Sequence, residues 1–203
     1  MRILVLKASP LGHDSVSNAA ADAFVEACRT AHPEHQITIK DLSALTLPPI
    51  TADVLRYWDR GLREEEATGD LATLLSLCNE FVAADAYVIA ASHWNLMVNP
   101  TLVHYMVCVM RAGKTFRYTE NGSVGLLTGK KAQLIIASGG HCQDAAPTVR
   151  CYGEDWLRGL LTMAGVQDIS TLFIQGMEQE PQRANEIVAQ GIAQAAQLGT
   201  AWL

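Results

Sequence analysis

The stretch RILVLKASPLGHDSVSN, residues 2–18, contains the transition that decides the fold. It opens with Ile3 to Leu6, a short apolar run bounded by polar residues, which is typical of a buried parallel strand. A loop with three serines follows and leads into residues 15–31, whose apolar residues have helical spacing. The stretch therefore predicts a strand, a hydroxyl-lined loop and a helix in succession, which is how an α/β fold begins.

The rest of the chain repeats this alternation of short apolar runs and helical stretches. Further strands are expected at 36–42, 86–91, 132–137 and 169–174, and further helices at 71–83, 100–112, 148–164 and 181–198. Five strands that alternate with helices predict a doubly wound parallel sheet with helices on both faces. Because no second mononucleotide-binding half is present, we expect the flavodoxin-like strand order 2-1-3-4-5.

The length and composition favour a single domain. The chain has 203 residues, of which 49% are hydrophobic, which is enough for one sizeable core and short for two. No internal repeat or low-complexity linker divides it. We therefore expect one domain over residues 1–203, with a charged, partly helical surface segment inserted near 51–68.

Charge and cysteine content exclude several classes of partner. The net charge is −6 and the sequence pI is about 5.4, so we expect no binding to nucleic acid or to an anionic membrane. The start of the chain lacks a signal-peptide pattern, and no apolar run approaches the ~20 residues of a membrane span. The five cysteines are irregularly spaced and include no C-x-x-C, which indicates reduced thiols, a cytoplasmic protein and no metal site.

Ligands of such sheets bind beyond the carboxyl ends of the strands, so the loops at 8–17, 92–99 and 138–146 are the candidates. In the first loop, Ser9, Ser15 and Ser17 precede a helix N-terminus, an arrangement that suits a phosphate monoester. The alternative is that one serine merely caps the helix. One serine would suffice for a cap, so three favour phosphate.

The other two loops supply groups for a flat ring. Trp94 could pack along such a ring and Asn95 could hydrogen-bond its edge, although most tryptophans are ordinary packed aromatics. Gly139 and Gly140 permit close approach of a ligand to the backbone, or they form a plain turn. Taken together, the three loops predict a site for a flat heterocycle with a phosphate tail, for which FMN is the natural candidate in this fold.

Other phosphate-handling families do not fit these loops. A tyrosine phosphatase would need a cysteine and an arginine in the phosphate loop, and a receiver domain would need acidic residues where Ser9 and Ser92 stand. The segment GSVGLLTGKK, residues 122–131, departs from a P-loop at Val124 and Lys131. No Rossmann glycine fingerprint follows the first strand, so a tightly held dinucleotide is not expected.

The segment RAGKTFRYTENGSVGLLTGKKA, residues 111–132, resembles the FMN-dependent NADH-azoreductase family, also described as quinone reductases of flavodoxin-like fold. The likeness spans nearly the whole chain, and the opening S-x-L-x-x-x-S-x-S at Ser9–Ser17 reinforces it. It implies an enzyme that passes two electrons from NADH or NADPH to quinones or azo compounds through tightly bound, noncovalent FMN. It also implies a homodimer with active sites at the subunit boundary.

The resemblance assigns roles to individual residues. FMN contacts are expected from Ser9, Leu11, Ser15, Val16, Ser17, His93, Trp94, Asn95, Leu96, Ser138, Gly139 and Gly140. Phe116 and Tyr118 match a hairpin near 115–128 that folds over the flavin and meets substrate, and Asn121-Gly122 independently favours a hairpin turn. Tyr118 and His141 are candidate proton donors, with the catalytic assignment open.

Two departures and two alternatives accompany this interpretation. The family's P-M-Y-N-F loop is here Ser92–Leu96, with only Asn95 kept, and the family's S-x-G-G has its serine one place late, at Ser138, so the acceptor preference is open. The alternative function is a non-catalytic, electron-transfer flavodoxin, which the segments at 51–68 and 115–128 disfavour because they would cover the flavin edge. The helix expected at 100–112 independently favours a dimer, because it has more apolar residues than one core-facing stripe requires. The alternative is that this helix is deeply buried within one monomer. The apolar residues are Leu102, Val103, Tyr105, Met106, Val109 and Met110.

Overall fold

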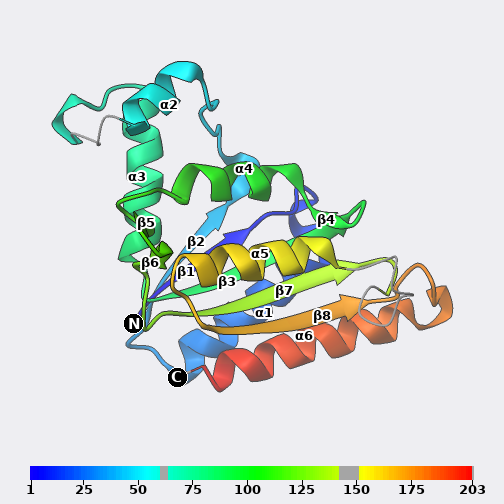
Figure 1. Cartoon of the computed structure of the whole chain (residues 1–203). Coiled ribbons are helices and arrows are strands. Elements are labelled where there is room, and N and C mark those ends of the chain that lie inside the picture. The colour runs from blue at the N-terminus through cyan, green and yellow to red at the C-terminus, as the bar shows by residue number, and fades with distance from the viewer. Residues whose placement is uncertain (60–63, 142–150, 203) are drawn as a thin grey trace.

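The computed structural model describes residues 1–59, 64–141 and 151–202, and its centre is a five-stranded parallel sheet (Figure 1). The strands are β1 (Arg2–Lys7), β2 (Gln36–Asp41), β3 (Ala86–Trp94), β7 (Lys131–Ser138) and β8 (Asp168–Gln175). Their order in the sheet is β2-β1-β3-β7-β8, with every neighbouring pair parallel. This confirms the predicted flavodoxin-like order, with β7 and β8 as the fourth and fifth core strands.

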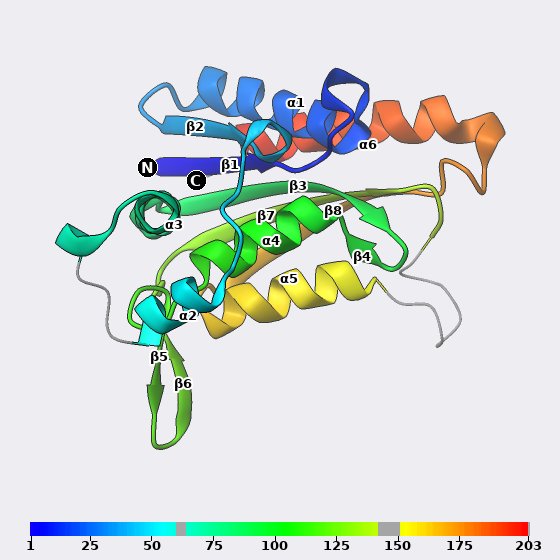
Figure 2. The ribbon, with the colours of Figure 1, turned by 90° about the horizontal axis from the view of Figure 1, so that it is seen from above.

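Helices cover both faces of the sheet, as Figure 2 shows from above. On one face lie α1 (Val16–Ala31) and α6 (Ala184–Thr200); on the other lie α3 (Asp70–Ala83), α4 (Pro100–Val109) and α5 (Tyr152–Met163). Because the central strands are buried on both faces, they are nearly continuous apolar runs. Each face has its own aromatic contact, Phe24 with Trp202 on the α1 side and Phe81 with Tyr87 on the other.

The segment at 51–68 projects from the body beside α3 (Figure 1). It contains α2 (Ala52–Asp59) and a 3-10 turn at Glu64–Glu66, and residues 60–63 lie outside the described part. Its base is packed, because Val54 and Trp58 lie against Leu74 and Cys108. The Arg111 guanidinium carbon stacks 3.0 Å from the centre of the Trp58 ring, which fixes α2 to the end of α4.

The predicted hairpin forms from β5 (Phe116–Thr119) and β6 (Gly122–Gly125), as a two-stranded sheet of its own. It stands at the edge where the parallel strands begin, because the Leu127 N–H donates to the carbonyl of Ala164 just before β8. Figures 1 and 2 both show it away from the carboxyl ends of β3 and β7.

The apolar excess of α4 is absorbed within the chain. Four of its residues have no exposed surface: Leu102, Tyr105, Met106 and Val109. Val103 and Met110 pack, partly buried, against the same core. The helix is therefore deeply buried within one monomer, which was the alternative interpretation, and its apolar residues are no evidence for a second subunit.

Three of the described cysteines are reduced, as expected, and one is not. Cys28, Cys78 and Cys108 are buried and free, whereas Cys151 is disulfide-bonded. The expectation of five reduced cysteines is thus wrong at Cys151, since irregular spacing along the chain does not report which sulfurs lie close in space. Cys142 lies outside the described residues.

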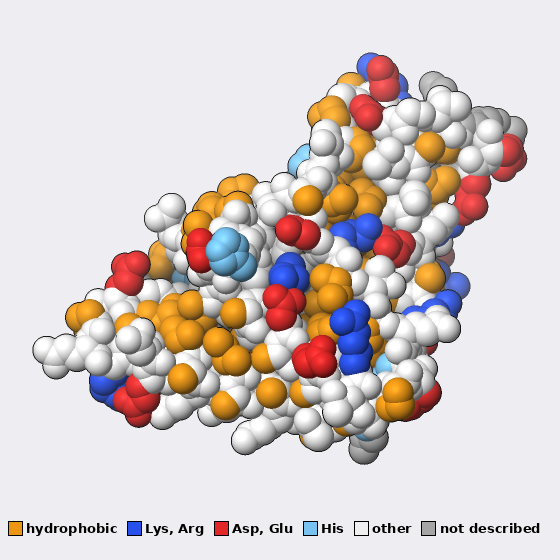
Figure 3. Space-filling view, turned by 180° about the vertical axis from the view of Figure 1, so that it is seen from behind, with side chains coloured by type: hydrophobic (Ala, Val, Ile, Leu, Met, Phe, Trp, Pro, Cys, Tyr) orange, Lys and Arg blue, Asp and Glu red, His pale blue; other side chains and the backbone are white. Residues whose placement is uncertain are grey.

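On the face seen from behind, acidic and basic side chains are interspersed (Figure 3). Within the part of the chain that the structure describes, no helix combines the length and the apolar character needed to cross a membrane.

Candidate functional site

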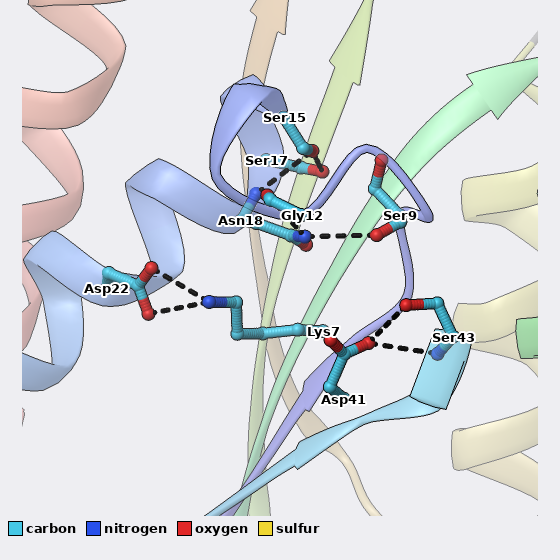
Figure 4. A network of polar contacts seen from close by, with 9 residues as sticks. All are labelled: Lys7, Ser9, Gly12, Ser15, Ser17, Asn18, Asp22, Asp41 and Ser43. Atoms are coloured by element: carbon cyan, nitrogen blue, oxygen red, sulfur yellow. Dashed lines mark hydrogen bonds and ion pairs between the residues drawn. The ribbon is translucent and has the colours of Figure 1, made fainter. Parts of the chain in front are cut away.

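The serine loop lies between β1 and α1, and its three hydroxyl-bearing side chains are buried. Ser9 and Ser17 have no exposed surface and Ser15 has 3%. The Ser15 hydroxyl accepts the Asn18 N–H at 3.3 Å and therefore caps α1, while it lies 3.1 Å from the Ser17 hydroxyl (Figure 4). The capping interpretation thus holds for Ser15, and Ser9 and Ser17 remain as buried hydroxyls beyond what a cap needs.

Asn18 holds the loop in shape. Its side-chain amide nitrogen donates to the carbonyls of Ser9, at 3.1 Å, and Gly12, at 3.0 Å. Gly12 has a φ of +57°, a backbone conformation that favours glycine. The Asn18 Oδ1 atom is buried and has no hydrogen-bond partner among the described residues. Asn18 was not predicted as a site residue, although an asparagine in the first turn of the helix, directly after the serines, could have indicated it.

The ammonium of Lys7, at the end of β1, does not point into the serine loop. The Lys7 ammonium is paired with both carboxylate oxygens of Asp22, at 2.8 and 2.9 Å, and Figure 4 shows it extending away from the hydroxyls. What remains for an anion is the set of hydroxyls and the first N–H groups of α1, which have no partner inside the helix. A phosphate fits this donor set.

Asn99 joins the two loops on either side of the switch point. Its amide nitrogen donates to the carbonyl of Ala8 at 2.6 Å, and its Oδ1 atom is buried with no partner among the described residues. Ala8 in turn donates its N–H to the carbonyl of Ala90 in β3. Sequence reasoning placed residue 99 inside the candidate loop but did not identify the side chain as a bridge.

The loop after β3 is a tight hairpin rather than an open loop. Trp94 pairs with Met97 and His93 with Val98, across a two-residue turn that leads into β4 (Met97–Val98). Asn95 and Leu96 in the turn have φ of +48° and +69°. Positive φ at both positions is the sign of a type I′ turn, and it is rare for leucine. Strain of about 1–3 kcal/mol at such a residue persists only where its surroundings enforce it.

The N-terminus of α5 enforces this turn. Gly153 donates its N–H to the Leu96 carbonyl at 3.1 Å. A Cβ atom at Gly153 would stand 2.5 Å from the backbone nitrogen of Val98, so only glycine permits the contact. Trp94 and Leu96 remain 42% and 38% exposed, which leaves an apolar surface at the mouth of the site.

His93 lies under the same turn and is held neutral. Burial lowers the pKa of its imidazole, more than a hydrogen bond to the Leu96 backbone raises it. Its Nε2 atom is buried and unpartnered among the residues described. A neutral ring with one unpaired nitrogen beside the switch point is available to a ligand.

Of the candidate loop at 138–146, residues 142–146 lie outside the described part, and the described part presents mainly backbone. The Ser138 hydroxyl donates to the Gly140 carbonyl at 2.6 Å, and the Gly139 carbonyl accepts the N–H groups of Glu178 and Gln179. His141 is drawn away from this loop, because its Nε2 lies 2.7 Å from a carboxylate oxygen of Glu180.

Comparisons with known proteins agree with this geometry. Residues 1–198 match the family described as having a flavodoxin-like fold. A relative named FMN-dependent NADH:quinone oxidoreductase, from Geobacillus kaustophilus, is 36% identical over 207 residues and covers 97% of both chains. Another from Halalkalibacterium halodurans is 37% identical over 205 residues, again with 97% of each chain covered. The chain belongs to this family of quinone oxidoreductases.

Solved structures of azoreductases have the same fold as this family member. An azoreductase from Bacillus anthracis superposes with a TM-score of 0.88 at 29% identity and covers all of both chains. An FMN-dependent NADH-azoreductase from the same species, solved in complex with FMN, has a TM-score of 0.82 at 26% identity over 98% of this chain and 99% of its own.

All twelve residues expected to contact cofactor lie in or directly beside three loops that the structure brings to one edge. These loops follow β1, β3 and β7, which are adjacent in the sheet, so their ends lie side by side. Phe116 and Tyr118 are not at this edge, because the hairpin stands where the strands begin. Phe116 is buried and Tyr118 is 76% exposed.

Proposed function

We propose that this chain is an FMN-dependent oxidoreductase that passes two electrons from NADH or NADPH to a small acceptor, a quinone or an azo compound. The observation that carries the proposal is the set of buried hydroxyls at the start of α1, next to a strained turn at the switch point of the sheet. The relatives and their names support the choice of cofactor and donor. The proposed unit is one FMN-binding domain over residues 1–203.

FMN would be held noncovalently by the serine loop and the backbone of the other two loops. When bound, it supplies the hydride and electron chemistry that no side chain provides. Ser9, Ser15 and Ser17 would bind the phosphate, together with the first N–H groups of α1. The turn at Asn95 and Leu96 would orient the flat ring, because the contact with Gly153 holds its backbone in place.

A proton donor is better sought in Tyr118 than in His141. The His141 ring is already paired with Glu180, which also accepts from Arg183 at 2.6 Å, and this holds the imidazole toward α6. Tyr118 has a largely exposed phenol with an edge-on contact to Phe116, 5.4 Å between ring centres. It would have to act on a site other than the one in its own chain.

We propose that a second copy of the chain supplies this hairpin, in a homodimer. Tyr118 stands at the opposite edge of the sheet from the serine loop, so it cannot meet a ligand bound in its own subunit (Figure 2). The exposed apolar residues near it and on neighbouring elements would be covered by the partner: Leu55, Val107, Val124 and Leu126. Reduced nicotinamide is a cytoplasmic metabolite, so we also propose the cytoplasm as the location.

Anaerobic mixing with NADH tests the function. The purified, FMN-loaded protein should lose its flavin absorbance near 450 nm on mixing with NADH, and a quinone added afterwards should restore the absorbance. Steady-state oxidation of NADH should then depend on the quinone. A protein that binds FMN but is bleached only by dithionite, with no response to NADH, would instead be an electron-transfer or non-catalytic flavodoxin.

A further inference from the structure

A second cluster of ligand-forming side chains lies at the opposite edge of the sheet from the proposed flavin site. It is the segment HPEH, residues 32–35, in the connection from α1 to β2. Glu34 Oε1 lies 3.2 Å from His35 Nδ1 and 3.9 Å from His32 Nδ1. One ligand atom from each of the three residues falls within 4.8 Å of the others. Two imidazoles and a carboxylate are ligands that transition metals take in proteins.

The hydrogen bond made by His32 sets its tautomer. Its Nε2 atom lies 2.9 Å from the carbonyl oxygen of Thr200, at the end of α6. A carbonyl can only accept, so Nε2 carries the hydrogen and Nδ1 presents its lone pair to Glu34. Metal-binding histidines usually donate their other ring N–H to a carbonyl or carboxylate in this way, which orients the ring and raises its basicity.

His35 is the least exposed member of the cluster. Its side chain is 8% exposed, and its ring stacks on that of His32 with 5.1 Å between centres. A metal ion would bind the neutral form of this ring, through the Nδ1 atom that faces Glu34.

We propose that His32, Glu34 and His35 bind one divalent transition-metal ion, for which zinc with water as its fourth ligand is the best match. In a tetrahedral zinc site with ligand bonds of 2.0–2.1 Å, neighbouring ligand atoms are about 3.3 Å apart. The present separations of 3.2 to 4.8 Å need only a small contraction, and the exposed Glu34 carboxylate is free to move. The ammonium of Lys131, 4.3 Å from the centre of the Trp202 ring, is a nearby charge that opposes a cation and moderates its affinity.

Such an ion would be a structural clamp. It would tie the connection between α1 and β2 to the last turn of α6, through the hydrogen bond of His32 to the Thr200 carbonyl. Figures 1 and 2 both show the two chain ends beside each other at this edge. The cysteine spacing predicted no metal site, whereas this cluster consists of two histidines and a glutamate.

Zinc titration of the FMN-loaded protein tests the proposal. After treatment with EDTA, competition with a chromophoric chelator should show one zinc ion per chain. At a zinc concentration of ~100 times Kd, Tm should rise by about 5 °C or more. The variants His32→Gln and Glu34→Gln should each bind zinc at least tenfold more weakly, and His104→Gln, on α4, should bind as the parent does.

The Glu34 variant separates zinc binding from folding. Because Glu34 is largely exposed, Glu34→Gln should fold with the parent's Tm in the absence of zinc, so its weaker binding cannot be a folding defect. No binding at one zinc per chain, or equal affinity in parent and Glu34→Gln, would overturn the site.

Discussion

The side-chain amide of Asn99 donates to the carbonyl of Ala8 at 2.6 Å, which ties the loop after β3 to the loop after β1. The two residues are 91 positions apart, and both are buried. This hydrogen bond lies at the switch point of the sheet, beside the proposed site. It therefore connects the hydroxyl loop and the strained turn, the two features on which the flavin assignment depends.

Replacing Asn99 by alanine should destabilise the protein by about 1–3 kcal/mol, because the buried carbonyl of Ala8 loses its donor. The free energy of unfolding in urea, measured without FMN, checks this. The matched control is Asn185→Ala on the exposed side of α6, which should change stability by no more than ~0.5 kcal/mol. An Asn99→Ala variant as stable as the control would contradict a stabilising role for the hydrogen bond between Asn99 and Ala8.

The left-handed turn at Leu96 should penalise a β-branched side chain. Leu96→Val is expected to cost about 1–2 kcal/mol, since valine tolerates a φ near +69° worse than leucine does. Leu126 is 40% exposed, close to the 38% of Leu96, and its φ is not positive, so Leu126→Val serves as the control. Urea unfolding of both variants compares them. Equal losses would mean that the turn is not strained.

His93 should make stability fall on acidification. Burial lowers its pKa in the folded state, so the unfolded chain binds the proton more readily. The contribution of the neutral His93 ring to the free energy of unfolding is fully present above the unfolded pKa of ~6.5. It is lost as the pH falls below that value toward the pKa of the folded state. Unfolding free energies at pH 7.5 and 5.5 should differ less in His93→Gln than in the parent. The difference should shrink only in part, because burial lowers the pKa of His35 as well. An unchanged difference would contradict the neutral His93.

Mixed dimers should reveal whether the hairpin acts across the subunit boundary. Tyr118→Ala chains keep an intact serine loop, and Ser15→Ala/Ser17→Ala chains keep an intact Tyr118. Each variant alone should reduce quinone slowly. In a mixed dimer, one site would combine the good serine loop of one chain with the good tyrosine of the other. Co-refolded mixtures should therefore regain up to about half of the parent activity per mixed dimer. Mixtures no faster than the average of the two variants would place the hairpin in its own chain's site.

Much of this architecture can be predicted from sequence because parallel strands are buried on both faces. Ile3 to Leu6 and the run at 86–91 are apolar at every position, a pattern that helices of this length do not need. The serine loop was equally predictable, since a helix start with extra hydroxyls is a local feature. Local patterns are decided by neighbours in the chain, which the sequence displays.

The rest depends on contacts between distant residues. Nothing local to Asn99 indicates that it reaches Ala8, and Leu96 adopts a positive φ only because Gly153, on α5, fits against it. The hairpin near 115–128 is predicted to fold over a flavin, and nothing local indicates which subunit holds that flavin. The described contacts of residues 111–132 lie at the opposite edge of the sheet from the serine loop, where Arg111 stacks on Trp58 and the Lys130 ammonium binds the carbonyls that end α3.

The assignment of the serine loop to the flavin phosphate is tested by the affinities of the Ser15→Ala/Ser17→Ala variant for FMN and for riboflavin. The two ligands differ only by the phosphate, so loss of the helix cap affects both, and loss of the phosphate site affects FMN alone. We expect the ratio of FMN to riboflavin affinity to fall at least tenfold, or ~1.4 kcal/mol, while Ser43→Ala, a change on the exposed turn after β2, leaves it unchanged. Equal weakening of both ligands would contradict the assignment of this loop to the flavin phosphate.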